Sequence, residues 1–268
     1  MAIRKAHSAM TAAEITAFVN ALKALKTNPV NGRGYNWYID VHIAWFSTVS
    51  GVRHAHRGPS FLPWHREYLR LLELDLQTVS GNPNMFLPYW NWGTRSADSL
   101  LFTSTFMGPA VNGSVTSGPF IPSAGWPVYR SSFASTFLQR RINTAATRPT
   151  STTITNVENT YPTYDNPAYD GAVSNSYRNQ NERQLHDQIH VWVGGNMGSQ
   201  DSPNDPLFFL HHCNVDRMWS RWQTRYGINT YRPTTATTGV VALNEQMRPF
   251  SRTPASVLSI TNLGYSYA

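Results

Sequence analysis

The sequence predicts a mainly α-helical protein whose core is a four-helix bundle, with long loops and few short strands. Apolar residues recur at helical spacing in four segments, and histidines share the inner faces of those segments. Residues 93–180, by contrast, are rich in Gly, Pro, Ser, Thr and Asn, which is typical of surface loops. Each pair of helices would then present histidines to the interior of the bundle.

The length and composition predict one domain, residues 1–268. A chain of 268 residues lies near the size at which a single core stops growing, and no linker or shift in composition divides it.

An amphipathic helix is predicted near the N-terminus. It begins at a capping-box pattern, in which Thr11 is followed three residues later by Glu14, and Asn28-Pro29 ends it. Its buried stripe would consist of Ile15, Phe18, Val19, Leu22 and Leu25.

Two further helices each carry a histidine. Residues 36–48 form one, in which His42 accompanies a face made of Trp37, Val41 and Trp45. Pro63 is expected to open the other, with His65 in its first turn and a buried stripe made of Leu69, Leu72 and Leu76. His56 precedes it in an irregular segment, from which its ring can complete a group of three imidazoles.

The remaining two helices supply a second group. His186 and His190 are four residues apart in a helical stretch, so their rings project from one face. Asp205-Pro206 is a strong helix start, and His211 and His212 follow it. Consecutive helical residues diverge by about 100°, so we expect only one of these two to join the group.

Two triplets of histidines in apolar and aromatic surroundings indicate two bound metal ions. Imidazole suits copper, zinc, iron and nickel, whereas calcium and magnesium prefer oxygen. Three imidazoles and an open position describe a catalytic metal site, and two such sites facing each other describe a binuclear one. His7 and His54 are expected to be ordinary core or surface histidines.

Charge and hydropathy exclude other classes of protein. The net charge of +7 comes with only 14% charged residues, and no basic run exceeds Arg140-Arg141, which disfavours nucleic-acid binding. No apolar segment approaches the roughly 20 residues that span a bilayer. The first residues lack the apolar core of a secretory signal, so both a secreted and a cytoplasmic location stay open. Cys213, the single cysteine, is expected to be a buried, inert thiol.

Ordered motifs run through nearly the whole chain: HRGPSFLPWHREYL, LPYWNW, LHDQIHVWVGG, SPNDPLFFLHHCNVDRMW and LGYSY. In these motifs the chain resembles the tyrosinase family of type-3 copper proteins, with its catechol oxidase and haemocyanin relatives. The resemblance implies two copper ions. The first would be held by His42, His56 and His65, and the second by His186, His190 and His212, with His211 beside the site.

The resemblance also implies an enzyme that uses O2 as co-substrate and acts on small phenols and catechols. It would hydroxylate monophenols ortho to the hydroxyl and oxidise o-diphenols to o-quinones, as in melanin formation. A catechol oxidase or o-aminophenol oxidase with little action on monophenols is the alternative, and an O2 carrier is a further one. The HDQIH segment superficially suggests a zinc hydrolase, but that hypothesis leaves the first triplet unexplained.

Members of the family are proposed to deprotonate phenols through a water held by a glutamate and an asparagine. Glu182 lies one helical turn before His186 and matches the glutamate, although a solvated acid at a helix start is the alternative. Asp187 replaces the asparagine. An ionised aspartate only accepts hydrogen bonds and would repel Glu182, which would either make a better base or spoil monophenol turnover.

Three more expectations follow from the motifs. Val191, directly after His190, would line the substrate entrance, or else pack in the core. Asp216, four residues after His212, would accept a hydrogen bond from that ring or form a helix salt bridge. The LGYSY segment resembles the motif that closes the catalytic domain, so we expect no C-terminal shielding domain and an open site, unless a separate shielding or copper-delivery protein binds.

Overall fold

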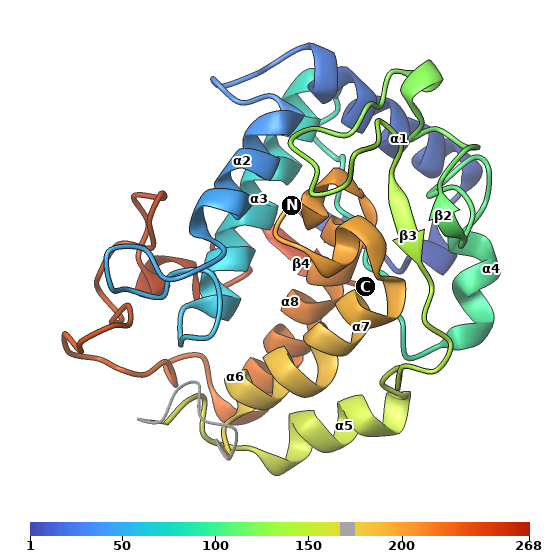
Figure 1. Cartoon of the computed structure of the whole chain (residues 1–268). Coiled ribbons are helices and arrows are strands. Elements are labelled where there is room, and N and C mark those ends of the chain that lie inside the picture. The colour runs from blue at the N-terminus through green and yellow to red at the C-terminus, as the bar shows by residue number, and fades with distance from the viewer. Residues whose placement is uncertain (167–174) are drawn as a thin grey trace.

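The computed structural model describes residues 1–166 and 175–268, and it places a bundle of helices inside a shell of loops (Figure 1). The part of the loop-rich region that falls at 167–174 lies outside the described residues. The bundle consists of α2 (Tyr35–Trp45), α3 (Phe61–Ser80), the continuous run α6 (Tyr177–Gln180), η4 (Asn181–His186) and α7 (Asp187–Val193), and α8 (Leu207–Tyr226). Helix α8 packs against both α3 and η4. The predicted fold class is confirmed.

Helix α1 (Ala12–Thr27) covers α3 and begins as predicted. The Thr11 hydroxyl accepts the Glu14 N–H at 3.2 Å, while the Glu14 carboxylate accepts the Thr11 N–H at 2.8 Å. These two bonds satisfy backbone donors that the first turn of a helix leaves without partners. The helix stops at Asn28.

The buried face of α2 differs from the predicted one. Trp37 and Trp45 are only partly buried, and the face turned inward carries Tyr35, Tyr38, Ile39, Val41 and His42. Tyrosines can lie here because their hydroxyls find acceptors: Tyr35 donates to the Pro203 carbonyl at 2.7 Å and Tyr38 to the Asp75 carboxylate at 2.5 Å.

Helix α3 begins at Phe61, two residues before Pro63, so His65 is its fifth residue and lies in the second turn, not in the first as predicted. A proline is tolerated there because the N–H groups of the first turn have no partner within the helix. The stripe of Leu69, Leu72 and Leu76 is fully buried, as predicted.

The helix that carries His186 is not a regular α-helix throughout. Residues Asn181–His186 form a π-helical stretch between α6 and α7. Such stretches are rare and often mark functional sites, and the apolar spacing of the sequence does not reveal this one.

The start of α8 is close to the predicted position. The Asp205 carboxylate accepts the Leu207 N–H at 3.1 Å. It also forms a buried ion pair with Arg140 at 2.7 Å, which joins the bundle to strand β3 (Gln139–Arg141).

The remaining elements are short. Strand β1 (Ala2–Arg4) pairs in parallel with β4 (Tyr265–Tyr267), and β2 (Asn112–Ser114) pairs antiparallel with β3 (Gln139–Arg141). Single turns and short helices make up the rest: η1 (His7–Ala9), η2 (Arg95–Ala97), α4 (Asp98–Leu101), η3 (Pro122–Ala124), α5 (Ser151–Thr160), η5 (Gly195–Gly198), η6 (Ser202–Asn204) and η7 (Pro254–Val257).

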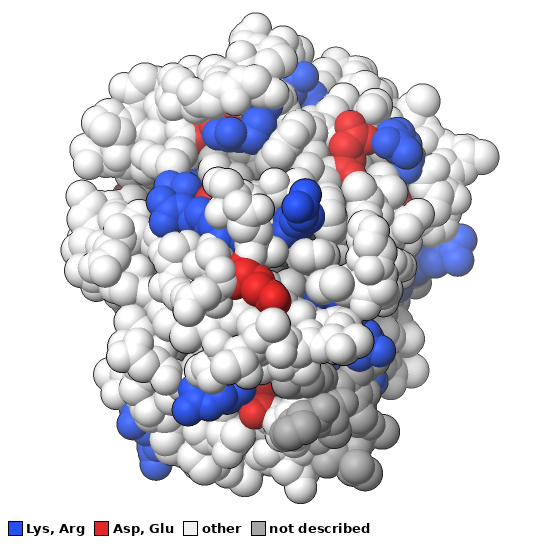
Figure 2. Space-filling model, turned by 90° about the vertical axis from the view of Figure 1, so that its left-hand side faces the viewer, with Lys and Arg blue, Asp and Glu red and all other residues white. Residues whose placement is uncertain are grey.

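The surface carries few charges. On the face shown in Figure 2, Lys, Arg, Asp and Glu side chains form small scattered groups with broad uncharged regions between them. Over residues 1–166 and 175–268, no helix combines the length and apolar character that crossing a bilayer requires.

Asp216 of α8 ties both ends of the chain to the bundle. Its carboxylate accepts from Arg66 of α3 at 2.5 Å, from Arg4 of β1 at 3.3 Å, and from Tyr265 and Tyr267 of β4 at 2.7 and 2.6 Å. Burial alone would raise the pKa of this carboxyl, but Arg66 and Arg4 outweigh it and hold the pKa below its ordinary value. The network therefore depends on a buried anion.

Replacing that anion should destabilise the fold. Asp216→Asn leaves two buried guanidinium groups short of a partner, and we expect the free energy of unfolding to fall by about 3 kcal/mol, measured by urea titration of metal-free protein. The control is Arg130→Gln, which breaks an exposed ion pair with Asp40 and should cost less than about 1 kcal/mol. Equal losses in the two variants would contradict this role for Asp216.

Candidate metal centre

The first histidine group is assembled from two helices and a loop. His42 comes from α2, His65 from α3 and His56 from the bend before α3, and one ring nitrogen of each lies within 4.8 Å of the others. The centroid of the His56 ring is 5.1 Å from that of His42 and 5.0 Å from that of His65.

Backbone carbonyls orient these three rings. The Nδ1 of His42 lies 2.7 Å from the Gln200 oxygen, that of His56 3.2 Å from Phe46, and that of His65 2.9 Å from Phe61. A neutral ring that donates through Nδ1 carries its lone pair on Nε2. The Nε2 atoms of His42 and His65 are buried and have no hydrogen-bond partner among the described residues.

The second group is tighter. The Nε2 of His186 lies 3.0 Å from that of His190 and 3.2 Å from that of His212, and the latter two are 3.4 Å apart. His190 Nδ1 faces the Met197 carbonyl at 2.5 Å and His186 Nδ1 faces the Asp187 carboxylate at 2.9 Å, so both rings direct lone pairs at the centre. In these two neutral rings the hydrogen is on Nδ1, so Nε2 cannot donate. Only the His212 Nε2 can still donate, and therefore at most one of the three Nε2 contacts is a hydrogen bond.

This arrangement fits a metal ion. Ligand nitrogens about 2 Å from a tetrahedral first-row ion are about 3.3 Å from one another, close to the spacing in the second group. Burial, the largest effect, lowers the pKa of all six rings, that of His42 to about 4. The imidazoles are therefore neutral near pH 7 and free to bind a metal without losing a proton.

The two groups adjoin. The rings of His65 and His212 stack with centroids 4.1 Å apart and planes 14° apart, and the His56 and His186 centroids are 6.3 Å apart. Ions held by the two groups would be neighbours, which is the geometry of a binuclear centre.

His211 lies closer to the second group than expected. One of its ring nitrogens falls within 4.8 Å of the ligand atoms of that group, and its ring stacks on His186 at 5.0 Å. Nevertheless, it is His212 whose Nε2 faces those of His186 and His190. The predicted bond from His212 to Asp216 is wrong, since the His212 Nδ1 has no partner among the described residues and the arginines and tyrosines of the network occupy the carboxylate. Asp216 instead pairs with arginines of other elements.

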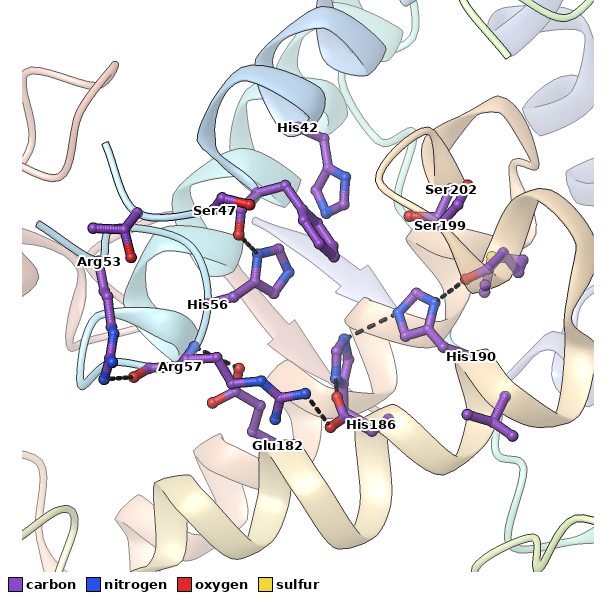
Figure 3. Close-up of a pocket in the computed structure, with 16 residues that line it drawn as sticks. His42, Ser47, Arg53, His56, Arg57, Glu182, His186, His190, Ser199 and Ser202 are labelled. Atoms are coloured by element: carbon purple, nitrogen blue, oxygen red, sulfur yellow. Dashed lines mark hydrogen bonds and ion pairs between the residues drawn. The ribbon is translucent and has the colours of Figure 1, made fainter. Parts of the chain in front are cut away.

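Both groups open onto one cavity of about 490 Å³ (Figure 3). Its lining includes His42, His56, His186, His190, Phe46, Met197, Val191, Glu182, Asp187 and Arg57. Val191 is 52% exposed, so it lies at the mouth of the cavity and does not pack in the core. A cavity of this size accommodates a single aromatic ring.

Glu182 and Asp187 both line the cavity, and each has its own arginine. Glu182 accepts the Arg57 backbone N–H at 2.8 Å and pairs with Arg178 at 2.7 Å. Asp187 pairs with the Arg57 guanidinium at 2.8 Å. Burial raises the pKa of both carboxyls, and the neighbouring arginines reduce that shift. Repulsion between the two acids, which the sequence led us to expect, is weaker than the attraction of either to its arginine.

The sequence did not identify Arg57 or the orienting carbonyls as part of the site. Arg57 directly follows His56 in the HRGP segment, and that adjacency is the one available signal. The carbonyls of Phe46, Met197 and Gln200 leave no trace in the sequence, because every residue has one. Cys213 is buried as predicted, and burial raises the pKa of its thiol to about 12.

A helical bundle that directs two sets of imidazoles at one cavity has the ligands for two neighbouring metal ions. Residues 32–225 match the common central domain of tyrosinase. The tyrosinases of Streptomyces glaucescens and Streptomyces antibioticus are each 39% identical over 97% of both chains, and the grixazone synthase of Streptomyces griseus is 34% identical over 99% of this chain and 98% of its own length. The chain belongs to the tyrosinase family, and that membership implies a dicopper centre.

Solved structures show the same fold. A mutant polyphenol oxidase from Thermothelomyces thermophila superposes with a TM-score of 0.70 at 20% identity, over 100% of this chain and 89% of the other. A functional unit of octopus hemocyanin gives 0.65 at 22% identity, over 100% of this chain and 68% of the other. At such identities the likeness is evidence for the fold alone.

Replacing one ligand histidine should abolish one of the two copper sites. We expect His65→Gln and His190→Gln each to retain one copper ion per chain, because an amide is a poor copper ligand and the other group stays intact. Elemental analysis after removal of loosely bound copper measures this. His54→Gln is the control and should retain two, since His54 belongs to neither group. Two tightly bound ions in either test variant would show that the removed ring is not a ligand.

Proposed function

We propose that the protein is a type-3 copper oxidase that uses O2 to hydroxylate monophenols ortho to the hydroxyl and to oxidise o-diphenols to o-quinones. The observation that carries this proposal is the pair of neutral imidazole groups that open onto one cavity with room for an aromatic ring. Family membership supports copper as the metal.

The first copper would be held by His42, His56 and His65, and the second by His186, His190 and His212. When bound, the copper pair would supply the redox chemistry by which electrons pass from the phenolic substrate to O2, with the ions alternating between Cu²⁺ and Cu⁺. The part of the protein is to hold six rings in place and to exclude competing reactions.

The walls of the cavity suit a flat apolar ring. Phe46 lies against the rings of His42 and His56, with centroids 5.6 and 4.8 Å apart. Val191 adds apolar surface at the mouth. A phenol ring between these side chains would point its hydroxyl at the histidine groups and displace water from them.

Glu182 is the group we assign to accept the phenolic proton. It is buried at the cavity, and each of its oxygens keeps acceptor capacity beyond the bonds from Arg57 and Arg178. Asp187 has a different part in the proposal. Its bond to His186 Nδ1 fixes the tautomer and orientation of that ring, as carboxylates commonly do for metal-binding histidines.

The decisive experiment compares substrates. Copper-loaded protein should consume O2 with both 4-methylphenol and 4-methylcatechol, because the cavity admits either ring, and initial rates measure both. Turnover of the catechol alone would reduce the proposal to a catechol oxidase, and preference for 2-aminophenol would favour an aminophenol oxidase. Reversible O2 binding without turnover of 4-methylphenol, 4-methylcatechol or 2-aminophenol would show that the protein is an O2 carrier and not an enzyme.

Glu182→Gln should separate the two activities. Both substrates lose phenolic protons, but the monophenol hydroxyl is the less acidic, so we expect the kcat/KM of the monophenol to fall by about 100-fold and that of the catechol by much less. Glu14→Gln, at the exposed start of α1, is the control. Equal losses on both substrates would mean that Glu182 supports the structure of the site and does not accept the proton.

A further inference from the structure

Of the six histidines assigned to the metal centre, His56 is the one that no helix positions. It lies in a bend between α2 and α3. Its Nδ1 contact with the Phe46 carbonyl, at 3.2 Å, is also the longest of the ring contacts to backbone in the two groups. The position of this ring must therefore depend on what the adjacent residues contact.

The next residue, Arg57, reaches the helix of the second group by two separate contacts (Figure 3). Its backbone N–H donates to Glu182 at 2.8 Å, and its guanidinium pairs with Asp187 at 2.8 Å. Asp187 in turn accepts from His186 Nδ1 at 2.9 Å. A continuous path of bonds thus runs from a ligand of the first ion, His56, to a ligand of the second, His186.

The backbone of Arg57 is held in an unfavourable conformation. Its φ of 57° lies in the left-handed region, which residues other than glycine rarely adopt. Such residues persist where surrounding contacts hold them, and they collect at functional sites. The Arg57 side chain is 38% exposed and that of Asp187 25%, so their pairing contributes little to overall stability. We therefore expect the Arg57–Asp187 pair to affect the geometry of the site more than the stability of the fold.

We propose that Arg57 is a positioning residue that sets the separation of the two copper ions by clamping the His56 loop onto the helix of His186. The inference rests on the proposed dicopper function. Arg57 touches neither ion and acts through the placement of the two rings.

Arg57→Gly tests this directly. Glycine tolerates the left-handed conformation and keeps the N–H that Glu182 accepts, so the variant loses the guanidinium and little else. We expect two copper ions per chain, as in the unaltered protein. Two neighbouring cupric ions that share a bridging ligand pair their spins and lose the ordinary EPR signal. The EPR-visible share of the copper should therefore rise several-fold in the variant, because its ions are no longer held close enough to be bridged. The kcat for 4-methylcatechol should fall about 10- to 100-fold, with KM changed less.

The chain offers a matched control. Arg130 also has a left-handed backbone, with φ of 47°, and also pairs with an aspartate, Asp40, at 2.8 Å. It does not line the cavity. Arg130→Gly should leave the copper content, the EPR-visible share and kcat unchanged.

A double-mutant cycle identifies the route. If the guanidinium acts through Asp187, then Asp187→Asn added to Arg57→Gly should change kcat and the EPR-visible share little beyond Arg57→Gly alone. Additive effects, or an Arg57→Gly variant with the EPR signal and kcat of the unaltered protein, would overturn the inference. Failure of the proposed function would show differently, as absence of copper or of catechol turnover in the unaltered protein.

Discussion

The structure depends on holding neutral imidazoles against one another in a largely buried site beside one cavity. Three Nε2 atoms of the second group lie 3.0 to 3.4 Å apart, and the Nε2 atoms of His42 and His65 are buried without partners among the described residues. Each buried polar atom without a partner costs about 1–3 kcal/mol. The helices must therefore be anchored by other contacts, and the buried Asp216 network and the Arg140–Asp205 pair provide them.

Orientation of the rings comes mainly from loop carbonyls, so distant loops belong to the centre. Met197 offers its carbonyl to His190 from η5, which lies against β3. That approach requires glycine: Gly195 has a φ of +57°, and a Cβ built on it would lie 1.9 Å from the Gln139 carbonyl oxygen. The Asn196 side chain then accepts the Gln139 N–H at 2.8 Å and fixes the contact. A glycine that is not itself a ligand thus determines where a ligand ring points.

The sequence predicted those parts of the molecule in which local pattern and final structure agree. The capping box at Thr11, the leucine stripe of α3 and the pair of histidines four residues apart all depend on helical periodicity, which is a local property. The predicted inner face of α2 was wrong. Tyr35 and Tyr38 lie there in place of the tryptophans, because their hydroxyls find acceptors on distant segments. The predicted partner of Asp216 was wrong for the same reason. Its actual partners lie far away in the sequence, at both ends of the chain and in α3, so helical spacing cannot identify them.

Asp187, at the position where the family resemblance implies an amide, has a physical compensation that only the folded structure reveals. An amide beside a metal-binding ring is neutral, whereas a carboxylate there adds a charge that needs a cation nearby. Arg57 supplies that cation from the loop of the first group, and Arg178, one turn earlier on the same helical run, supplies the cation for Glu182. Each acid is thus balanced by one arginine before any ion binds, so the charge that the copper ions bring is not cancelled by these acids. An incoming phenol that loses its proton would then meet a net positive centre, which favours the phenolate over the neutral phenol.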